Sequence, residues 1–304
     1  MKMSFNELYT KLYRENFAEL EQMRASTRKK SIGIIVLFIS IFLLSMINPL
    51  FMIIGSILLF IYVIVDFRTS KGATNNKSYR QVFKEKIVGP IIENCFETAK
   101  YTPTAGMAIL DYKKAGYDDD IDRYSSDDLI TAALNVDGKT TTVITFAEVH
   151  TEKESKDNEG RTTYSTVFHG LAGRFILPKN TQNRIYIRTN GKVSNWNKNK
   201  VKMDMTEFEK IFDVESEDPI LAMRILTADV MTEMIDLYKK YKCRFEISII
   251  DDTAYMRLRT GPMFEPNMFK DSMEYKQLER YYLILKNLID IASHMYDTIN
   301  RLEL

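Results

Sequence analysis

The sequence is poor in the residues that build disulfide-rich domains and metal sites. Its 304 residues include two cysteines, Cys95 and Cys243, too few for a disulfide framework or a zinc finger. Three histidines leave little for a histidine-rich metal site. The 42 basic and 41 acidic residues give a net charge of +1, so no excess positive charge is available to bind nucleic acid. We therefore expect no nucleic-acid partner.

Short catalytic motifs are also missing. The chain has no Gly-x-Ser-x-Gly nucleophile turn, no glycine loop that would cradle a phosphate, and no Cys-x-x-Cys pair. We therefore expect no cofactor, and the residues identify no reaction.

One long stretch has no charged residue. Between Lys30 and Asp66 the only interruption is Asn48-Pro49. As one helix this run would be about 50 Å long, whereas a hydrocarbon core is about 30 Å thick. Because proline disfavours helix in the residue before it, we predict a transmembrane helical hairpin over 31–66. A buried hairpin of a soluble protein and a cleaved signal peptide are the alternatives.

The two predicted spans lie near Ile32–Ile47 and Leu50–Val65. Neither has the polar face of a soluble core helix, which favours the membrane. Arg28-Lys29-Lys30 precede the first span, and Arg68 and Lys71 follow the second. Positive residues stay on the cytoplasmic side. We expect a protein of the bacterial plasma (inner) membrane with both termini cytoplasmic and the lipid bilayer as a partner.

The rest of the chain divides into three predicted parts. Residues 1–30 form an amphipathic N-terminal helix, 67–76 a linker, and 77–304 a cytoplasmic α+β domain. The apolar stripe of the N-terminal helix suits packing on the membrane surface, on a partner protein, or on this protein's own soluble domain. The sequence does not decide among these three.

The domain over 77–304 has the pattern of a largely antiparallel sheet, with helices from its C-terminal third covering one face. A helix is expected over about 79–100. The expected strands and turns are Leu129–Val136 and Thr140–Val149 joined by Asp137-Gly138, a long exposed loop over Thr151–Gly160, a strand near Thr162–Leu171, a short strand at Ile185–Arg188, and a hairpin of residues 245–249 and 254–258.

Helix signals mark the C-terminal third. Thr206-Glu-Phe-Glu209 has the sequence of a capping box, and Thr227 is expected to cap a second helix. In the last helix, from Ser272 to Leu302, apolar residues recur every seven positions. That spacing permits an oligomer through a coiled coil, but the stripe is wide enough to favour packing within one molecule.

Three residues form a candidate catalytic or metal site. Glu148 and His150 point to one face of a predicted strand, and His169 lies on the next strand. Together they could bind a metal or serve as acid and base. If the loop between the strands centres near Asp157, however, the two histidines lie more than about 10 Å apart. We therefore expect these side chains to be ordinary surface or rim residues, and we expect no bound metal.

Two further groups are candidates for ligand binding. Residues 118–128 hold six carboxylates, among them Asp127 and Asp128, and such a cluster can bind a cation. It lacks the alternating ligands and central glycine of a calcium loop, which favours a solvated turn. Arg257 and Arg259 share a strand face and could receive a phosphate or carboxylate, although a solvated face is the simpler interpretation.

Several motifs resemble one known family. They are Phe208–Met231, Asp122–Ile130, Glu148–His150, Val167–Gly170 and Phe264–Pro266. Together they are similar to the bacterial domain-of-unknown-function family 3137, over roughly residues 75 to 304. The resemblance implies bacterial membrane proteins with two helices before a soluble domain. It implies no reaction, and no residue role follows from it.

The sequence therefore favours a membrane-anchored cytoplasmic binding or scaffold module with a protein partner. The alternative is a membrane-bound hydrolase or other enzyme that uses Glu148, His150, His169 or the carboxylates of 118–128.

Overall fold

A computed structural model describes residues 2–48, 50–72, 78–117, 120–136, 139–157, 159–190 and 199–303. The chain forms two compact units. The first comprises Met1–Phe5, Val88–Phe264 and Lys276–Leu304, and the second comprises Asn6–Ile87 and Glu265–Tyr275. The predicted division into 1–30, 31–66, 67–76 and 77–304 stays a prediction, and residues 73–77 of the expected linker lie outside the described residues.

The first unit is built on a sheet in which every strand pair is antiparallel. Among the described residues it has nine strands, in the order β1-β2-β3-β4-β9-β8-β5-β7-β6. The strands are β1 Ala99–Thr102, β2 Arg123–Val136, β3 Lys139–Lys156, β4 Thr162–Ile176, β5 Ile185–Thr189, β6 Lys200–Val201, β7 Phe212–Ser216, β8 Phe245–Ile250 and β9 Thr253–Leu258. The prediction of a mixed fold with a largely antiparallel sheet is confirmed.

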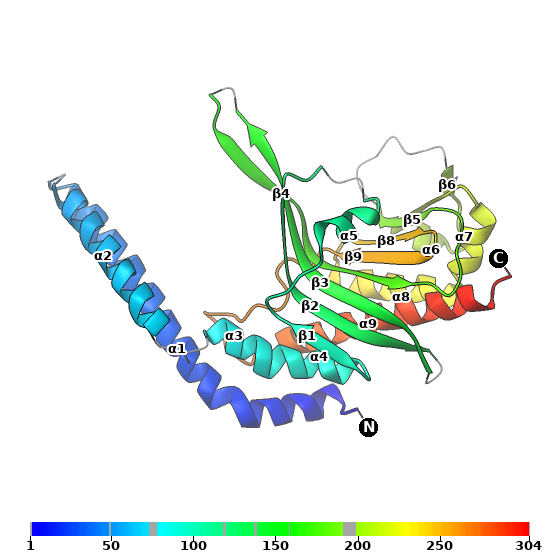
Figure 1. The fold of residues 1–304 in the computed structure, drawn as a ribbon, viewed down its shortest axis with the longest axis horizontal. Helices are drawn as coiled ribbons and strands as arrows, with labels where there is room; N and C mark the ends of the chain where they lie inside the picture. Colours follow the sequence, from blue (N-terminus) through cyan, green and yellow to red (C-terminus); the bar gives the residue numbers. More distant parts are fainter. Residues whose placement is uncertain are drawn as a thin grey trace. The chain divides into compact units, whose positions relative to one another are not determined.

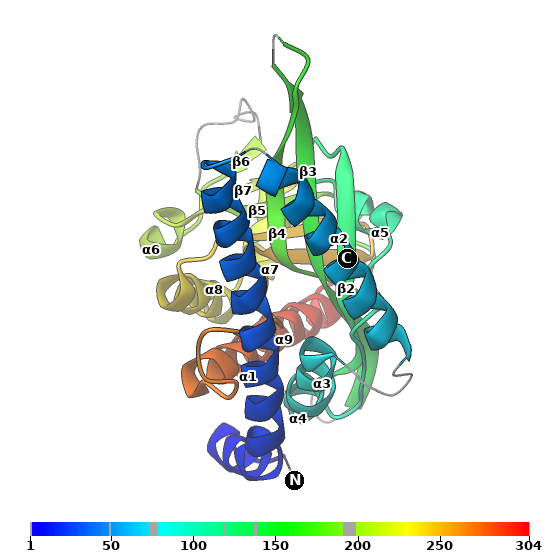
Figure 2. The same ribbon diagram turned by 90° about the vertical axis from the view of Figure 1, so that its left-hand side faces the viewer.

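Helices cover both faces of this sheet. They are α4 Gly89–Cys95, α5 Ile109–Lys114, α6 Thr206–Glu209, α7 Pro219–Ile225, α8 Ala228–Tyr241 and α9 Tyr275–Arg301. Figure 1 shows α8 and α9 across one face and α5 on the other, and Figure 2 shows the same layers from the side. The heptad residues of α9, such as Leu285 and Met295, are fully buried. An oligomer through residues 272–302 stays a prediction.

One of the two predicted helix caps is confirmed, and the other is wrong. Thr227 caps α8 as expected, because its side chain accepts a hydrogen bond from the Val230 N–H. The capping box at Thr206 is wrong. Helix α6 begins after Met205, which makes no side-chain cap, and lasts four residues before strand β7. The Glu209 carboxylate accepts instead from the Met203 N–H at 2.9 Å, so it is bonded to the segment before the helix and not to the N–H of Thr206.

The helix expected over about 79–100 is confirmed from Tyr79 to Cys95, but it contains a π-helical turn and ends early, because Lys100 belongs to β1. The segment consists of α3 Tyr79–Phe83, a π-helical turn over Lys84–Val88, and α4, which ends at Cys95. Pro90, in the first turn of α4, has no N–H to continue the preceding hydrogen-bond ladder. Such interruptions commonly produce a π-turn.

The second unit contains a long helical hairpin. Helix α1 runs without a break from Phe5 to Ser45, and α2 runs from Leu50 to Gly72 (Figure 1). The helices pack closely at Gly55, where an added Cβ would lie 2.6 Å from the Ile41 side chain. The Asn48 side chain accepts from the Leu50 N–H at 3.0 Å and starts α2.

The predicted transmembrane character of this hairpin is not supported. Among the described residues, no helix has both the length and the apolar content that crossing a bilayer requires. In α1 the uncharged part begins at Ser31 and the helix ends at Ser45, short of the roughly 20 apolar residues of a typical span.

Candidate functional site

The site is set by the pairing of β3 with β4. Strand β3 continues past its predicted end at Val149 to Lys156, β4 begins at Thr162 as predicted, and their paired ends form a ribbon that projects from the sheet (Figure 1). At its tip the Asp157 N–H donates to the Arg161 carbonyl, and the Asp157 carboxylate accepts from the Arg161 N–H at 2.9 Å. The expected long loop over 151–160 is therefore wrong, because Thr151–Lys156 belong to β3.

This hairpin places His150 directly opposite His169. The sequence estimate put His150 opposite about Tyr164, and that estimate is wrong for two reasons. The turn centres two residues later than Asp157, and an irregularity between Thr151 and Glu152 shifts the ladder further in the same direction. Histidines expected more than about 10 Å apart are therefore cross-strand neighbours.

The two imidazoles stack on each other. Their ring centroids are 4.3 Å apart and their planes differ by 23°. The His150 Nε2 lies 3.2 Å from the Thr166 hydroxyl and 4.0 Å from a Glu152 carboxylate oxygen. Both side chains keep part of their surface in solvent, 32% for His150 and 27% for His169. The pair can therefore receive a ligand from solution.

Glu148 is the buried partner of this pair. One carboxylate oxygen lies 3.2 Å from the His169 Nε2, and the other accepts from the backbone N–H groups of Met263 and Phe264 at 2.9 and 3.4 Å. Only 6% of the residue is exposed. A carboxylate offers only acceptors, so Nε2 of His169 is the donor, and its Nδ1 then carries the lone pair.

A backbone contact fixes the loop that supplies these N–H groups. The Gly261 N–H donates to the His169 carbonyl at 3.0 Å. At Gly170 an added Cβ would lie 2.1 Å from the Leu258 carbonyl oxygen, so only glycine permits this approach. The backbone of β4 and the loop after β9 therefore hold the carboxylate-binding N–H groups in place.

Burial lowers the pKa of His169, and the Asp127 carboxylate opposes that shift. Asp127 lies opposite Glu148 in the β2–β3 ladder. The neutral imidazole is therefore favoured near neutral pH. One nitrogen of each of the two histidines and an oxygen of Glu148 do not all lie within 4.8 Å of one another, so these three groups do not surround one point.

The acidic run over 118–128 is spread along the start of β2. Residues 118 and 119 lie outside the described residues. Asp120 forms an ion pair with Lys153, and Asp122 accepts from a backbone N–H of β3 at 2.6 Å. These two carboxylates thus fasten β2 to the ribbon.

The two last carboxylates of the run have different surroundings. Asp128 is fully buried, has a φ of 56°, and accepts from the Tyr101 hydroxyl at 2.5 Å. It sits at an irregularity of β2, where pairing with β3 skips from Asp127 to Ile130. The buried Asp128 side chain therefore makes its hydrogen bond within the fold, to Tyr101. Asp127 is the cross-strand partner of Glu148.

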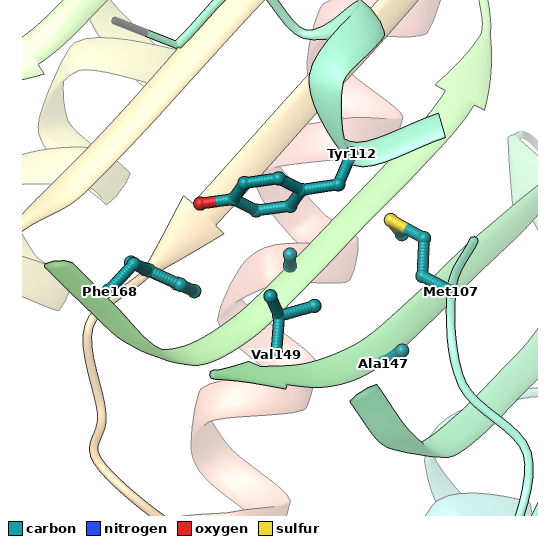
Figure 3. Close-up of a cluster of buried hydrophobic side chains, with 6 residues drawn as sticks. Met107, Tyr112, Ala147, Val149 and Phe168 are labelled. Carbon is teal, nitrogen blue, oxygen red and sulfur yellow. The ribbon is translucent and has the colours of Figure 1, made fainter. Parts of the chain in front are cut away.

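Arg257 is not on a solvated strand face, contrary to expectation. It is buried, and its guanidinium donates to the Glu246 carboxylate at 2.7 and 3.0 Å and to the Tyr112 hydroxyl at 2.7 Å. The Tyr117 ring lies 3.9 Å from it. Figure 3 shows Tyr112 above the apolar cluster that includes Val149. This arginine already holds a carboxylate of its own chain.

Arg259 donates to the Val167 carbonyl. Nothing in the sequence pattern predicts Glu246, Tyr112 or Thr166 as parts of these arrangements. Only the strand pairing brings them to the arginine and to His150, and no local motif marks them.

Comparisons with known proteins agree with the resemblance in part. Residues 166–296 match the family described as "Protein of unknown function (DUF3137)". The crystal structure of the mycobacterial trehalose monomycolate transport factor A, TtfA, aligns over 71% of this chain and 97% of that chain, with 8% identity and a TM-score of 0.35. No curated protein sequence matches the chain.

The Glu148 carboxylate should contribute more to stability than an exposed glutamate. Replacing it by Ala leaves two backbone N–H groups without their acceptor, so Glu148→Ala should lower the free energy of unfolding by about 1–3 kcal/mol. Glu148→Gln keeps one acceptor oxygen and should cost less. Urea unfolding of the full chain in detergent measures both.

The matched control is Glu93→Ala on the exposed side of α4, which should change stability by less than about 0.5 kcal/mol. Equal effects at the two positions would show that the buried carboxylate has no structural role.

Proposed function

We propose that this protein is a membrane-anchored binding module, held at a lipid bilayer by the hairpin of α1 and α2. The observation that carries the proposal is the exposure of the hairpin's apolar side chains. Phe38, Phe42 and Phe60 are 62%, 60% and 67% exposed. An apolar surface of this extent is unfavourable in water.

The apolar surface surrounds the hairpin, which favours lipid over a protein partner. Five successive residues, Ile35–Ile39, are all exposed, and successive helix positions point in directions about 100° apart. A protein partner would cover one side, whereas acyl chains cover every side.

The few polar side chains of the hairpin are satisfied within it. The hydroxyls of Ser40 and Ser56 donate to the carbonyls of Val36 and Met52, at 2.8 and 2.7 Å. Hydrocarbon offers no hydrogen-bond partner, so a bilayer-inserted helix must satisfy such groups internally. The charges that flank the hairpin favour the cytoplasmic side of the plasma (inner) membrane for both termini.

The binding part of the proposal rests on the ribbon of β3 and β4. Strand β9 pairs with β4 only from Leu171 onward, so the described ladder leaves Thr162–Phe168 with β3 on one side alone. An open strand edge is a template on which another chain can add a strand. The partner is therefore a protein that pairs through its backbone.

The enzyme alternative receives no support from the described residues. Glu148 holds His169 and two backbone N–H groups, and Arg257 holds Glu246. None of these contacts presents a nucleophile to an acid or base.

The anchor is tested by fractionating cells that express the full chain. We expect the protein in the membrane fraction after washing with 1 M salt, because apolar insertion is not screened by salt. Phe38→Asp/Phe60→Asp places two charges in the hydrocarbon, each costing about 2.5–3.5 kcal/mol, and should release it. The matched control, Lys11→Asp/Glu15→Asp on the exposed polar part of α1, should stay bound.

Reporter fusions at the two ends test orientation in the same cells, and both should report the cytoplasm. A wild-type chain recovered without detergent, or a periplasmic signal from either end, would contradict the anchor as proposed.

The ribbon is tested with a photo-crosslinking amino acid at Ser165. We expect a discrete protein adduct in cells, since this exposed position lies on the open edge of β4. The same amino acid at Lys113, exposed on α5, is the control and should give none. No adduct at Ser165, or the same adduct at both positions, would exclude the ribbon as the binding surface.

A further inference from the structure

We propose that His150 and His169 bind a divalent transition-metal ion of the zinc kind through one imidazole nitrogen each, with Glu148 as a positioning residue. The proposal concerns the sheet of the first unit and is independent of the membrane anchor. It replaces the expectation of no metal, which depended on the wrong strand register.

The two histidines lie close enough to share one ion. They are direct cross-strand partners on one face of an antiparallel pair, with ring centroids 4.3 Å apart. A tetrahedral zinc ion with Zn–N bonds of about 2.0–2.1 Å holds two nitrogens about 3.3 Å apart. In the stacked arrangement the nitrogen lone pairs lie in nearly parallel planes, so the rings must turn out of the stack for one nitrogen of each to reach the same ion. Both side chains are partly exposed, which leaves room for that rotation.

A hydrogen bond to Glu148 orients the His169 ring. In metal sites a ligating histidine usually donates its other ring N–H to a carboxylate, which fixes the tautomer and the ring orientation. Glu148 makes this contact at 3.2 Å and is itself held by two backbone N–H groups. His169 therefore presents Nδ1 as a preoriented ligand.

The remaining ligand positions are accessible. Glu152 has a carboxylate oxygen 4.0 Å from the His150 Nε2, and both rings reach solvent. Two imidazoles, with water completing the shell, form a donor set that suits Zn²⁺ and Cu²⁺ and disfavours Mg²⁺ and Ca²⁺. Glu152 and the two histidines do not converge on one point, so Glu152 is not counted as a ligand.

The test is titration of the metal-free full chain in detergent with Zn²⁺, followed by calorimetry. We expect one zinc per chain. His150→Ala and His169→Ala should each weaken affinity at least tenfold, and the double variant should bind none. Glu148→Gln should weaken affinity about 10–100-fold with unchanged stoichiometry, as for other partners of ligating histidines.

Two controls separate this site from other zinc ligands. His294→Ala removes a histidine that pairs with Glu233 on α8, and Cys95→Ser/Cys243→Ser removes the two buried thiols. Both should bind zinc as the wild type does. X-ray absorption of the zinc-loaded wild type should show two imidazole ligands, a readout that does not depend on any variant folding.

The proposal is overturned by any of three results. They are a wild type that binds no zinc at 100 µM metal, a folded double histidine variant that binds it unchanged, and a zinc spectrum dominated by sulfur at about 2.3 Å.

Discussion

The pairing of β3 with β4 is the constraint on which the site depends. A tight turn at Asp157 and an irregularity beside Thr151 set the register, and a slip of one residue would move every side chain of a strand to the other face. With this register, Glu148, His150 and His169 share a face, and Val149 joins the apolar cluster on the opposite face. One pairing therefore determines both the core and the polar site.

The two faces of the sheet hold their charged groups in different ways. On the α5 face Arg257 and Glu246 form a buried, hydrogen-bonded ion pair, which leaves neither charge without a partner. On the other face Glu148 is held by backbone N–H groups and by a partly exposed histidine. In the first arrangement the two charges already satisfy each other, and the arginine is buried. The second ends in imidazoles that solution reaches, and that difference favours the histidine pair as the place where a ligand from solution can bind.

Local patterns predicted much of the fold. Alternating residues located β8 and β9, and Thr227 located the start of α8, because each signal lies within a few residues of the element that it specifies. The site was less predictable. Its residue types were visible, but their distances depend on a turn position and an irregularity that no local pattern marks. Arg257 appeared solvated in the sequence because its partner Glu246 lies on another strand.

The central claim is that His150 faces His169, and disulfide trapping tests it most directly. In a full chain carrying Cys95→Ala and Cys243→Ala, His150→Cys/His169→Cys should oxidise to an intrachain disulfide, because cross-strand Cα atoms lie about 4.5–5.5 Å apart. His150→Cys/Tyr164→Cys should stay reduced, since five residues along a ladder span about 17 Å. A disulfide in the second pair and none in the first would contradict the register and the site built on it.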